Sequence, residues 1–225
     1  MLFEDRRDAG RELARMAATL PNLDHAIVLG LPRGGVPVAF EVARALHLPL
    51  DILMVRKLGA PGQRELALGA VASGGGAALN DDVLRAFNIS EKKLSEMVRR
   101  EREEIARRER EYRGARPALE IEGTTAILVD DGLATGASMK AAARAVRGRA
   151  RRVVIAVPVA ALSSLEELES EVDATVCVAA PEEFEAVGQF YRNFEPTSDE
   201  EVRRLLAEAY RESISGSPNS YPQQT

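Results

Sequence analysis

One stretch decides how this 225-residue chain folds: Val129-Asp130-Asp131-Gly132-Leu133-Ala134-Thr135-Gly136-Ala137-Ser138. Four apolar residues, from Ala126 to Val129, run into two adjacent carboxylates, a short loop of small residues follows, and a helical pattern begins at Met139. This order of residue types predicts a strand, a loop and the N-terminus of a helix. The first backbone amides of a helix are unpaired and the helix dipole adds partial positive charge, so the stretch predicts a phosphate-binding site.

The loop and the acids suit different parts of one ligand. Gly136 and Ala137 allow backbone amides to approach an oxyanion closely, and Thr135 and Ser138 add hydroxyl donors. The two carboxylates would repel a phosphate, but they suit sugar hydroxyls or a hard cation such as Mg²⁺. We therefore expect a ligand that combines a phosphate, a ribose and a metal-chelating group.

Other interpretations of this stretch explain less of it. An ordinary strand-to-helix turn accounts for one aspartate as a helix cap, but not for two in tandem. The stretch lacks the Gly-Lys-Ser/Thr ending of a Walker A loop and the spacing of a dinucleotide-binding fingerprint. A phosphatase or hydrolase that used Asp130 as its nucleophile would be expected to carry Asp-x-Asp rather than adjacent acids.

The same stretch resembles the 5-phosphoribosyl-1-pyrophosphate (PRPP) loop of type I phosphoribosyltransferases. In that family, two acidic residues hold the ribose hydroxyls and the loop after them wraps the 5-phosphate. The resemblance implies that Asp130 and Asp131 are catalytic and bind the ribose, with Mg²⁺ held by both acids or only through PRPP. It also implies that the phosphate is bound by Gly132, Leu133, Ala134, Thr135, Gly136, Ala137 and Ser138.

A second loop, Leu31-Pro32-Arg33-Gly34-Gly35, also follows an apolar segment and precedes a helical pattern. Its arginine charge and its two glycines suit a phosphate, and the loop resembles the pyrophosphate loop of the same family. The resemblance implies a catalytic Arg33, phosphate-binding amides at Gly34 and Gly35, and a cis peptide bond between Pro32 and Arg33. A tight turn explains Arg-Gly-Gly equally well by itself, but it does not explain the pairing with the acidic loop.

Arg56 and Lys57 are expected to close a strand from Leu50 to Val55. The resemblance implies that Arg56 binds PRPP and that Lys57 is catalytic, because their charges would neutralise a leaving pyrophosphate; a solvated basic pair is the simpler alternative. Residues 56–79 are rich in glycine and small residues and predict a long loop or a β-flap. The resemblance implies that this segment is a lid that closes over the substrate. Two charged residues of this lid are Arg64 and Glu65.

Strands alternate with helices along most of the chain, which predicts an α/β fold with a doubly wound parallel sheet. We expect one domain over residues 1–212, a helical insertion over 80–114, and a disordered tail over 213–225 after a terminal helix. The insertion holds a long charged helix over 90–112. We interpret it as a solvent-exposed helix with i,i+4 ion pairs rather than a nucleic-acid or coiled-coil helix.

An aromatic cluster falls in residues 181–196 of a chain that has few aromatic side chains. The resemblance implies that this segment is the small hood that holds the acceptor base in the family. Aromatic faces stack on planar bases, but they also pack against a sheet, and the sequence leaves both interpretations open. The clustered residues are Phe184, Phe190, Tyr191 and Phe194.

The composition limits where the protein acts and what it binds. A net charge of −5 and a pI near 5.3 argue against a broad nucleic-acid surface. The sequence shows no secretory signal and no apolar run of about 18 residues, so we expect a cytoplasmic protein without a membrane partner. His25 and His47 have no Cys or His companions at ligand spacing, which argues against a protein-built zinc site. The family often dimerises, and Leu94 and Val98 are candidates for a homodimer contact.

The resemblance implies a pentosyl transferase, a glycosyltransferase of nucleotide metabolism that moves the 5-phosphoribosyl group of PRPP to a nitrogenous base and releases pyrophosphate. Its hypoxanthine and guanine members place a third aspartate just before the threonine of the loop, as a proton acceptor for the purine. This chain has Ala134 there, which disfavours a 6-oxopurine acceptor. The alternative is a non-catalytic protein on the same fold that senses PRPP or a nucleotide and regulates transcription.

Overall fold

The centre of the molecule is a five-stranded sheet in the computed structural model, which describes residues 2–60 and 63–216. The strands are β1 (Ala26–Gly30), β2 (Leu50–Ile52), β6 (Thr125–Val129), β7 (Arg152–Val159) and β8 (Ala174–Ala179). They lie in the order β2-β1-β6-β7-β8, and all neighbouring pairs are parallel. The predicted α/β fold with a parallel sheet is therefore confirmed.

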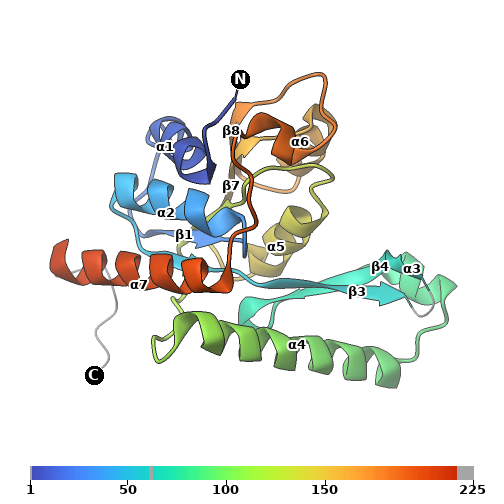
Figure 1. Ribbon diagram of the computed structural model, residues 1–225. Coiled ribbons are helices and arrows are strands. Elements are labelled where there is room, and N and C mark those ends of the chain that lie inside the picture. The colour runs from blue at the N-terminus through green and yellow to red at the C-terminus, as the bar shows by residue number, and fades with distance from the viewer. Residues whose placement is uncertain (1, 61–62, 217–225) are drawn as a thin grey trace.

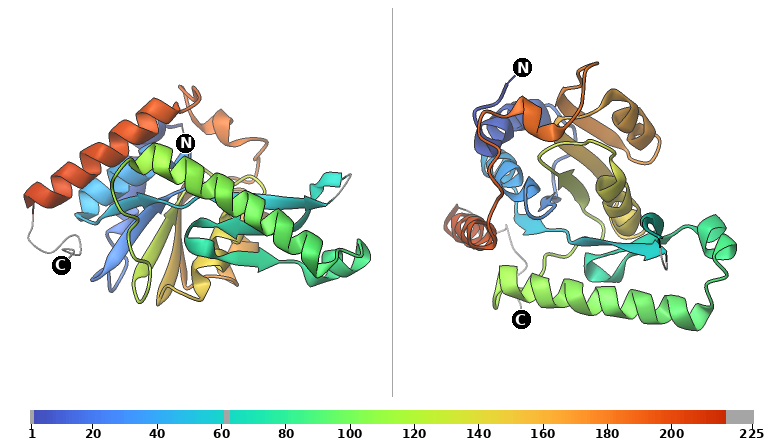
Figure 2. Two further views of the ribbon diagram at one scale, coloured as in Figure 1. Left: turned by 90° about the horizontal axis from the view of Figure 1, so that it is seen from below. Right: turned by 45° about the vertical axis from the view of Figure 1, so that its right-hand side comes forward.

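Helices cover both faces of this sheet (Figure 1; Figure 2). They are α1 (Arg6–Ala17), α2 (Gly35–Leu46), α5 (Ala137–Arg147), α6 (Leu162–Glu169) and α7 (Asp199–Gly216). α1 and α2 pack on one face, and α5 and α6 pack on the other. α7 packs beside α2, outside the layer that α1 and α2 form on the sheet.

The strands are apolar at nearly every position because both of their faces are covered. Successive side chains of a strand point to opposite faces of the sheet. In β1, Val28 packs in the core cluster under α1 and α2, whereas Ile27 and Leu29 pack in the cluster under α5 and α6. Burial on both faces explains the continuous apolar runs that precede the two loops.

A second, antiparallel sheet follows β2 and forms the flap region. Its strands are β3 (Val55–Ala60), β4 (Gln63–Ala72) and β5 (Ala77–Leu79), with the short 3₁₀ helix η1 (Ser73–Gly75) between the last two. Figure 1 shows β3 and β4 extending away from the parallel sheet. Of the two structures predicted for residues 56–79, the segment therefore adopts the antiparallel β-structure and not one long loop.

β2 is shorter than the predicted strand, which extended to Val55. After β2, two hydrogen bonds connect Met54 to Ser73, directly after the end of β4. The amide of Met54 donates to Ser73 Oγ at 2.7 Å, and the amide of Ser73 donates to Met54 O at 2.9 Å. β3 then begins at once, so Arg56 and Lys57 lie inside the antiparallel sheet. The expectation that they close a parallel strand was wrong, because β2 ends at Ile52 and the chain pairs with β4 from Val55 onward.

Two helices follow the flap, as the sequence predicts: α3 (Asp81–Ala86) and α4 (Glu91–Arg113). Ser90 caps α4, since its hydroxyl accepts a hydrogen bond from the amide of Lys93 at 3.3 Å. Ion pairs on the exposed side, such as Arg99 with Glu103 at 2.8 Å, confirm the interpretation of α4 as a solvated, charged helix.

The apolar side of α4 packs on its own chain. α4 lies along β3 and β4 (Figure 2), and Leu94 and Val98 are partly buried against the main core cluster. This packing accounts for the thin apolar stripe of the helix within one chain. A homodimer contact through these two residues stays a prediction.

α7 continues beyond the predicted end of the terminal helix. It runs to Gly216, so residues 213–216 belong to a helix and not to a tail. Ser213 fits this position because its hydroxyl donates to Tyr210 O at 2.7 Å. Residues 217–225 of the expected tail lie outside the described residues. Within residues 2–60 and 63–216, no helix combines the length and the apolar character that crossing a membrane requires.

A buried ion pair joins the end of α4 to the central sheet. Arg113 Nε lies 2.7 Å from Asp51 Oδ1, and the two side chains are 10% and 7% exposed. The carboxylate of Asp51 also accepts hydrogen bonds from the amides of Ile52 at 2.8 Å and Leu119 at 3.0 Å. The pair therefore fixes both ends of the segment that leads back from the insertion into β6.

Replacing Arg113 with Ala is expected to destabilise the protein by about 3–5 kcal/mol, because it leaves a buried carboxylate without its cation. The matched control is Arg99→Ala, which breaks an ion pair whose side chains are both 63% exposed and should change the stability by less than about 1 kcal/mol. Urea unfolding of the two variants measures the difference. Equal losses of unfolding free energy in the two variants would show that the ion pair of Arg113 with Asp51 does not stabilise the fold.

Candidate functional site

The two predicted loops meet at the carboxyl ends of β1 and β6, which are neighbours in the sheet. The amide of Leu31 donates to Val129 O at 2.8 Å and ties one loop to the other. A Cβ on Gly34 would lie 2.1 Å from Asp131 Oδ2, and a Cβ on Gly35 would lie 2.6 Å from Val129 O. Only glycines allow this approach, so the Arg-Gly-Gly loop and the acidic loop form one site. The peptide bond between Pro32 and Arg33 is cis, as the resemblance implies.

Asp130 and Asp131 are both partly buried at this edge. The amide of Asp131 donates to Asp130 Oδ1 at 2.9 Å. Burial, together with the adjacent charge of Asp131, raises the pKa of Asp130 well above its ordinary value. Burial also raises the pKa of Asp131, and the hydrogen bond and the charge of Arg6 oppose this shift. Titratable groups with such perturbed pKa values are typical of functional sites.

Arg6 is a site residue that the sequence analysis missed. Its Nε lies 2.8 Å from Asp131 Oδ2, and its Nη1 donates to Glu195 O at 2.7 Å. Its guanidinium also lies 3.9 Å from the ring centroid of Phe194. No local signal marks this residue, because one of several arginines on an amphipathic helix has the pattern of an ordinary surface charge.

The phosphate loop has a free part and an anchored part. The amides of Thr135, Gly136, Ala137 and Ser138 make no hydrogen bond within the part of the chain that the structure describes. They stand at the N-terminus of α5, as an anion site requires. The amide of Leu133 instead donates to Val159 O at 2.9 Å, so it cannot bind a phosphate at the same time. Leu133 was expected to be a ligand, but its buried side chain and its amide anchor the loop to β7.

Two neighbours hold this loop in shape. Ser164 Oγ of α6 donates to Ala134 O at 2.6 Å. A Cβ on Gly132 would lie 2.6 Å from Val187 Cγ1, so the start of the loop is pressed against the 3₁₀ helix η2 (Val187–Phe190). The loop is therefore built between α6 and the predicted hood.

The basic residues are less closely grouped than the sequence predicts. Arg33 Nη1 lies 3.9 Å from Asp199 Oδ1, and its side chain is half exposed beside the two loops. Arg56 pairs with Glu101 of α4, so its charge is directed to the insertion and not to the loops. Lys57 is exposed on β3 and makes no ion pair among residues 2–60 and 63–216. Arg64 and Glu65 lie in β4, and their side chains are outside the described residues.

The aromatic residues of the predicted hood pack mainly against the protein itself. Phe190 and Tyr191 are buried in a cluster with Phe3. The ring centroids of Phe184 and Phe190 lie 5.3 Å apart, and those of Phe194 and Tyr191 lie 4.9 Å apart. Packing is therefore the correct interpretation for Phe190 and Tyr191, whereas Phe184 keeps a partly exposed side.

Tyr191 also holds the acidic loop directly. Its hydroxyl donates to Asp131 O at 2.6 Å. Burial raises the pKa of Tyr191, so the hydroxyl remains protonated and acts as a donor. Asp131 is thus held through its side chain by Arg6 and through its carbonyl by Tyr191.

At this site, the two acids offer oxygens that suit a divalent cation. Residues 2–60 and 63–216 contain no cluster of three or more His, Cys, Asp or Glu side chains able to hold a metal. Asp130 and Asp131 supply carboxylate oxygens, which is the ligand chemistry that Mg²⁺ prefers. The chemistry of these two side chains is therefore compatible with Mg²⁺.

Comparison with known proteins gives this site a family. The sequence model of the phosphoribosyl transferase domain matches residues 4–195, which include both loops and the predicted hood up to Glu195. The chain belongs to the phosphoribosyltransferase family. The resemblance that rests on the two loops is therefore confirmed.

Two kinds of relatives of this phosphoribosyltransferase domain bear this out. Proteins of two Mycobacterium tuberculosis strains, provisionally named phosphoribosyl transferases, are 47% identical over 212 residues, which are 94% of this chain and 48% of theirs. The chain thus spans about half the length of these curated relatives. The crystal structure of TT1426 from Thermus thermophilus has a TM-score of 0.83 at 45% identity and covers 92% of this chain and 99% of its own.

Replacing Gly35 with Ala is expected to lower the melting temperature, because the new Cβ would lie 2.6 Å from Val129 O and 2.8 Å from Asp130 Cα, both backbone atoms. Overpacking of this kind costs about 1–3 kcal/mol. Gly148→Ala is the matched control, since no atom lies within 4 Å of its Cβ. Thermal unfolding followed by circular dichroism compares the two, and equal melting temperatures would contradict the close approach of the loops.

Replacing Asp130 with Asn is expected to stabilise the protein above pH 7. Because burial raises the pKa of Asp130, the folded state keeps the proton at pH values where the unfolded chain, with an ordinary Asp pKa of about 3.9, has released it. Wild-type stability is therefore lost as the pH rises from about 4 through the raised pKa. We expect the variant to melt about 2–4 °C above wild type at pH 8 and level with it at pH 4.

The control for this measurement is Asp82→Asn, which changes a carboxylate of α3 that is 90% exposed. Its melting temperature should follow that of wild type at both pH values. An Asp130→Asn variant whose melting temperature is not above that of wild type at pH 8 would contradict an unfavourable buried carboxylate at this position. An equal increase in melting temperature at pH 4 and pH 8 would contradict it as well.

Proposed function

We propose that this chain is a phosphoribosyltransferase enzyme that transfers the 5-phosphoribosyl group of PRPP to a nitrogenous base-like acceptor and releases pyrophosphate. The observation that carries the proposal is the contact between the acidic loop and the Arg-Gly-Gly loop, in a chain of this family. That contact brings together free amides, two carboxylates and an arginine, which are the groups that a phosphate, a ribose and a pyrophosphate require.

Each part of PRPP has a partner in this proposal. The 5-phosphate binds the amides of residues 135–138, where the dipole of α5 adds favourable charge. The ribose hydroxyls bind Asp130 and Asp131, and the pyrophosphate lies against Arg33 and Gly34. Lys57 reaches the pyrophosphate only if the flap carries β3 toward the loops, so its catalytic role depends on closure of the flap.

Mg²⁺ enters the site with PRPP in this proposal. The free carboxylate oxygens of Asp130 and Asp131 would hold it directly or through the ribose hydroxyls. The chemistry that the ion supplies when bound is neutralisation of charge on the departing pyrophosphate.

The reaction needs position and charge more than a covalent nucleophile. As the bond from C1 of the ribose to pyrophosphate breaks, C1 becomes oxocarbenium-like, and an acceptor nitrogen attacks from the opposite face. The protein holds the reactants in line and stabilises the leaving group with Arg33 and the loop amides. Closure of the flap excludes water, which would otherwise hydrolyse the sugar.

A second candidate function is a sensor that binds PRPP or a nucleotide without turnover. Ala134 favours it, because this exposed position lacks the acid that serves as proton acceptor in enzymes for 6-oxopurines. The packed hood aromatics favour it too, since Phe190 and Tyr191 offer no free face to a base. We rank transfer first because the groups that would stabilise a leaving pyrophosphate are retained.

Titration calorimetry with PRPP and Mg²⁺ tests the proposal. We expect saturable binding to the wild-type protein and none to the double variant Asp130→Asn/Asp131→Asn, which keeps the shapes of both side chains and removes both charges. Asp82→Asn is the control and should bind like wild type. Undetectable wild-type binding, or undiminished binding by the double variant, would end the proposal.

A pyrophosphate-release assay over a panel of purine and pyrimidine bases then separates the enzyme from the sensor. We expect release with at least one acceptor and faster release than with PRPP alone. Tight binding without release across the whole panel would favour the sensor.

A further inference from the structure

Arg6 lies where the ribose-binding acid and the hood meet. Its side chain is 11% exposed and that of Asp131 is 15% exposed, so the pair is largely removed from solvent. Charge-assisted hydrogen bonds in such surroundings are stronger and better oriented than those on an exposed surface. Tertiary contacts therefore fix the position of this buried guanidinium, unlike that of a solvent-exposed arginine.

Three groups fix the orientation of Arg6. Phe194 covers one face of the guanidinium, the carbonyl of Glu195 accepts from Nη1, and Asp131 Oδ2 accepts from Nε. Two of these groups belong to the hood, and the third belongs to the acidic loop. A planar guanidinium can satisfy all three at once, which a point charge such as an ammonium cannot.

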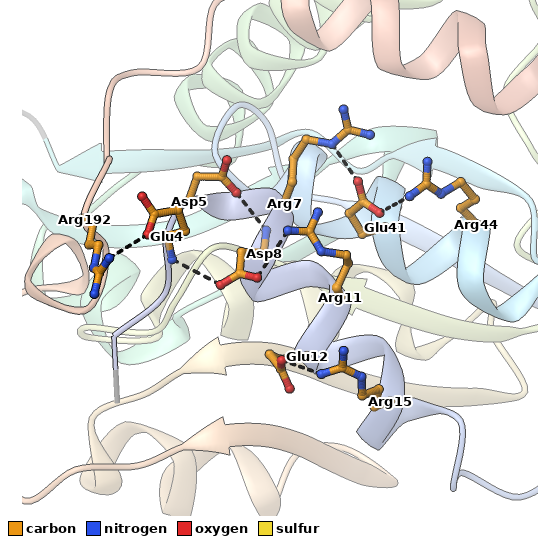
Figure 3. Close-up of polar contacts among 10 residues, drawn as sticks. All are labelled: Glu4, Asp5, Arg7, Asp8, Arg11, Glu12, Arg15, Glu41, Arg44 and Arg192. Atoms are coloured by element: carbon orange, nitrogen blue, oxygen red, sulfur yellow. Dashed lines mark hydrogen bonds and ion pairs between the residues drawn. The ribbon is translucent and has the colours of Figure 1, made fainter.

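The backbone that carries Arg6 is itself bound to the hood. The amide of Phe3 donates to Phe190 O at 2.8 Å, and the amide of Arg192 donates to Phe3 O at 2.9 Å. Figure 3 shows the ion pair of Glu4 with Arg192 in the same region, at 3.1 Å. Backbone hydrogen bonds and an ion pair therefore connect the start of α1 to the hood.

Neighbouring arginines of α1 turn elsewhere. Arg7 pairs with Glu41 of α2 at 2.6 Å, and Arg11 pairs with Asp8 of its own helix at 3.2 Å (Figure 3). Arg6 is the arginine of this helix that faces the acidic loop. Arg11, whose side chain is half exposed, offers a matched control on the same element.

The contacts of Asp131 leave one carboxylate oxygen for a ligand. Oδ2 faces both Arg6 Nε and the position where a Cβ of Gly34 would lie. No hydrogen bond of Oδ1 appears among residues 2–60 and 63–216. Arg6 therefore occupies Oδ2 and leaves Oδ1 as the oxygen of this carboxylate that a ligand hydroxyl could contact.

We propose that Arg6 is a positioning residue for ribose recognition, which holds the carboxylate of Asp131 in its binding orientation and makes that orientation depend on the hood. This inference rests on the proposed function and assigns a role to a residue outside both loops. Arg6 does not touch the reacting atoms and acts through Asp131. A hood that shifts on binding an acceptor would thereby alter how the sugar is held.

Calorimetry on the full chain tests this role with PRPP and Mg²⁺ and, separately, with pyrophosphate. Arg6→Met keeps the apolar length of the side chain and should weaken PRPP binding by at least about tenfold, because a charge-assisted hydrogen bond is lost. Pyrophosphate contacts the Arg-Gly-Gly loop and no ribose acid, but Arg6 Nε also lies 3.3 Å from where a Cβ of Gly34 would be. Its affinity should therefore fall by a clearly smaller factor than the affinity for PRPP. Arg11→Met should leave both affinities unchanged.

Two further variants guard against simple misfolding. Arg6→Lys keeps the charge and should recover part of the PRPP affinity that Arg6→Met loses. Phe194→Leu keeps the apolar contact, removes the aromatic face that orients the guanidinium, and should give an intermediate loss. Each variant is first compared with wild type by circular dichroism.

The outcomes separate this inference from the proposed function. An Arg6→Met variant that binds PRPP as well as wild type, or that loses pyrophosphate affinity to the same extent, would overturn the positioning role. Absence of PRPP binding by the wild-type protein would remove the proposed function itself, and this inference with it.

Discussion

The contact between Gly34 and the carboxylate of Asp131 is the constraint on which the site depends. It exists because β1 and β6 are adjacent at the centre of the sheet, while their chains leave in opposite directions. β1 continues through α2 to β2 on one side, and β6 continues through α5 to β7 on the other. Such a switch point opens a crevice at the carboxyl ends of the strands. The two loops line this crevice, and their glycines decide how closely they approach.

Holding two acids in this crevice costs stability that a purely structural protein would not give up. Burial raises the pKa of both carboxylates, so each resists ionisation where it stands. Arg6 and Tyr191 reach Asp131 from outside the loop and offset part of that cost. Proteins commonly accept local destabilisation where binding needs it. Through Tyr191, the hood thus supports the acidic loop.

The insertion relates to the site through the flap. Arg102 of α4 donates to Gly75 O at 2.7 Å, and Arg56 of β3 pairs with Glu101, so α4 holds the base of the flap at two points. The buried pair of Arg113 with Asp51 then ties the end of α4 to β2. These contacts make α4 a brace between the antiparallel sheet and the core.

The sequence by itself determined the alternation of strands and helices around the parallel sheet and the two loops, because strand and helix periods, glycines and helix N-termini are local patterns that neighbouring residues specify. It also placed both acids and Arg33 correctly at strand ends. It did not determine where β2 ends or that residues 56–79 form an antiparallel sheet. Only the tertiary structure decided the contacts between distant segments: Arg6 with Asp131, Arg56 with Glu101, and the amide of Leu133 with Val159. An arginine or an amide has the same local pattern whichever partner it finds. The partner is chosen by how the packed helices and sheets bring remote residues together.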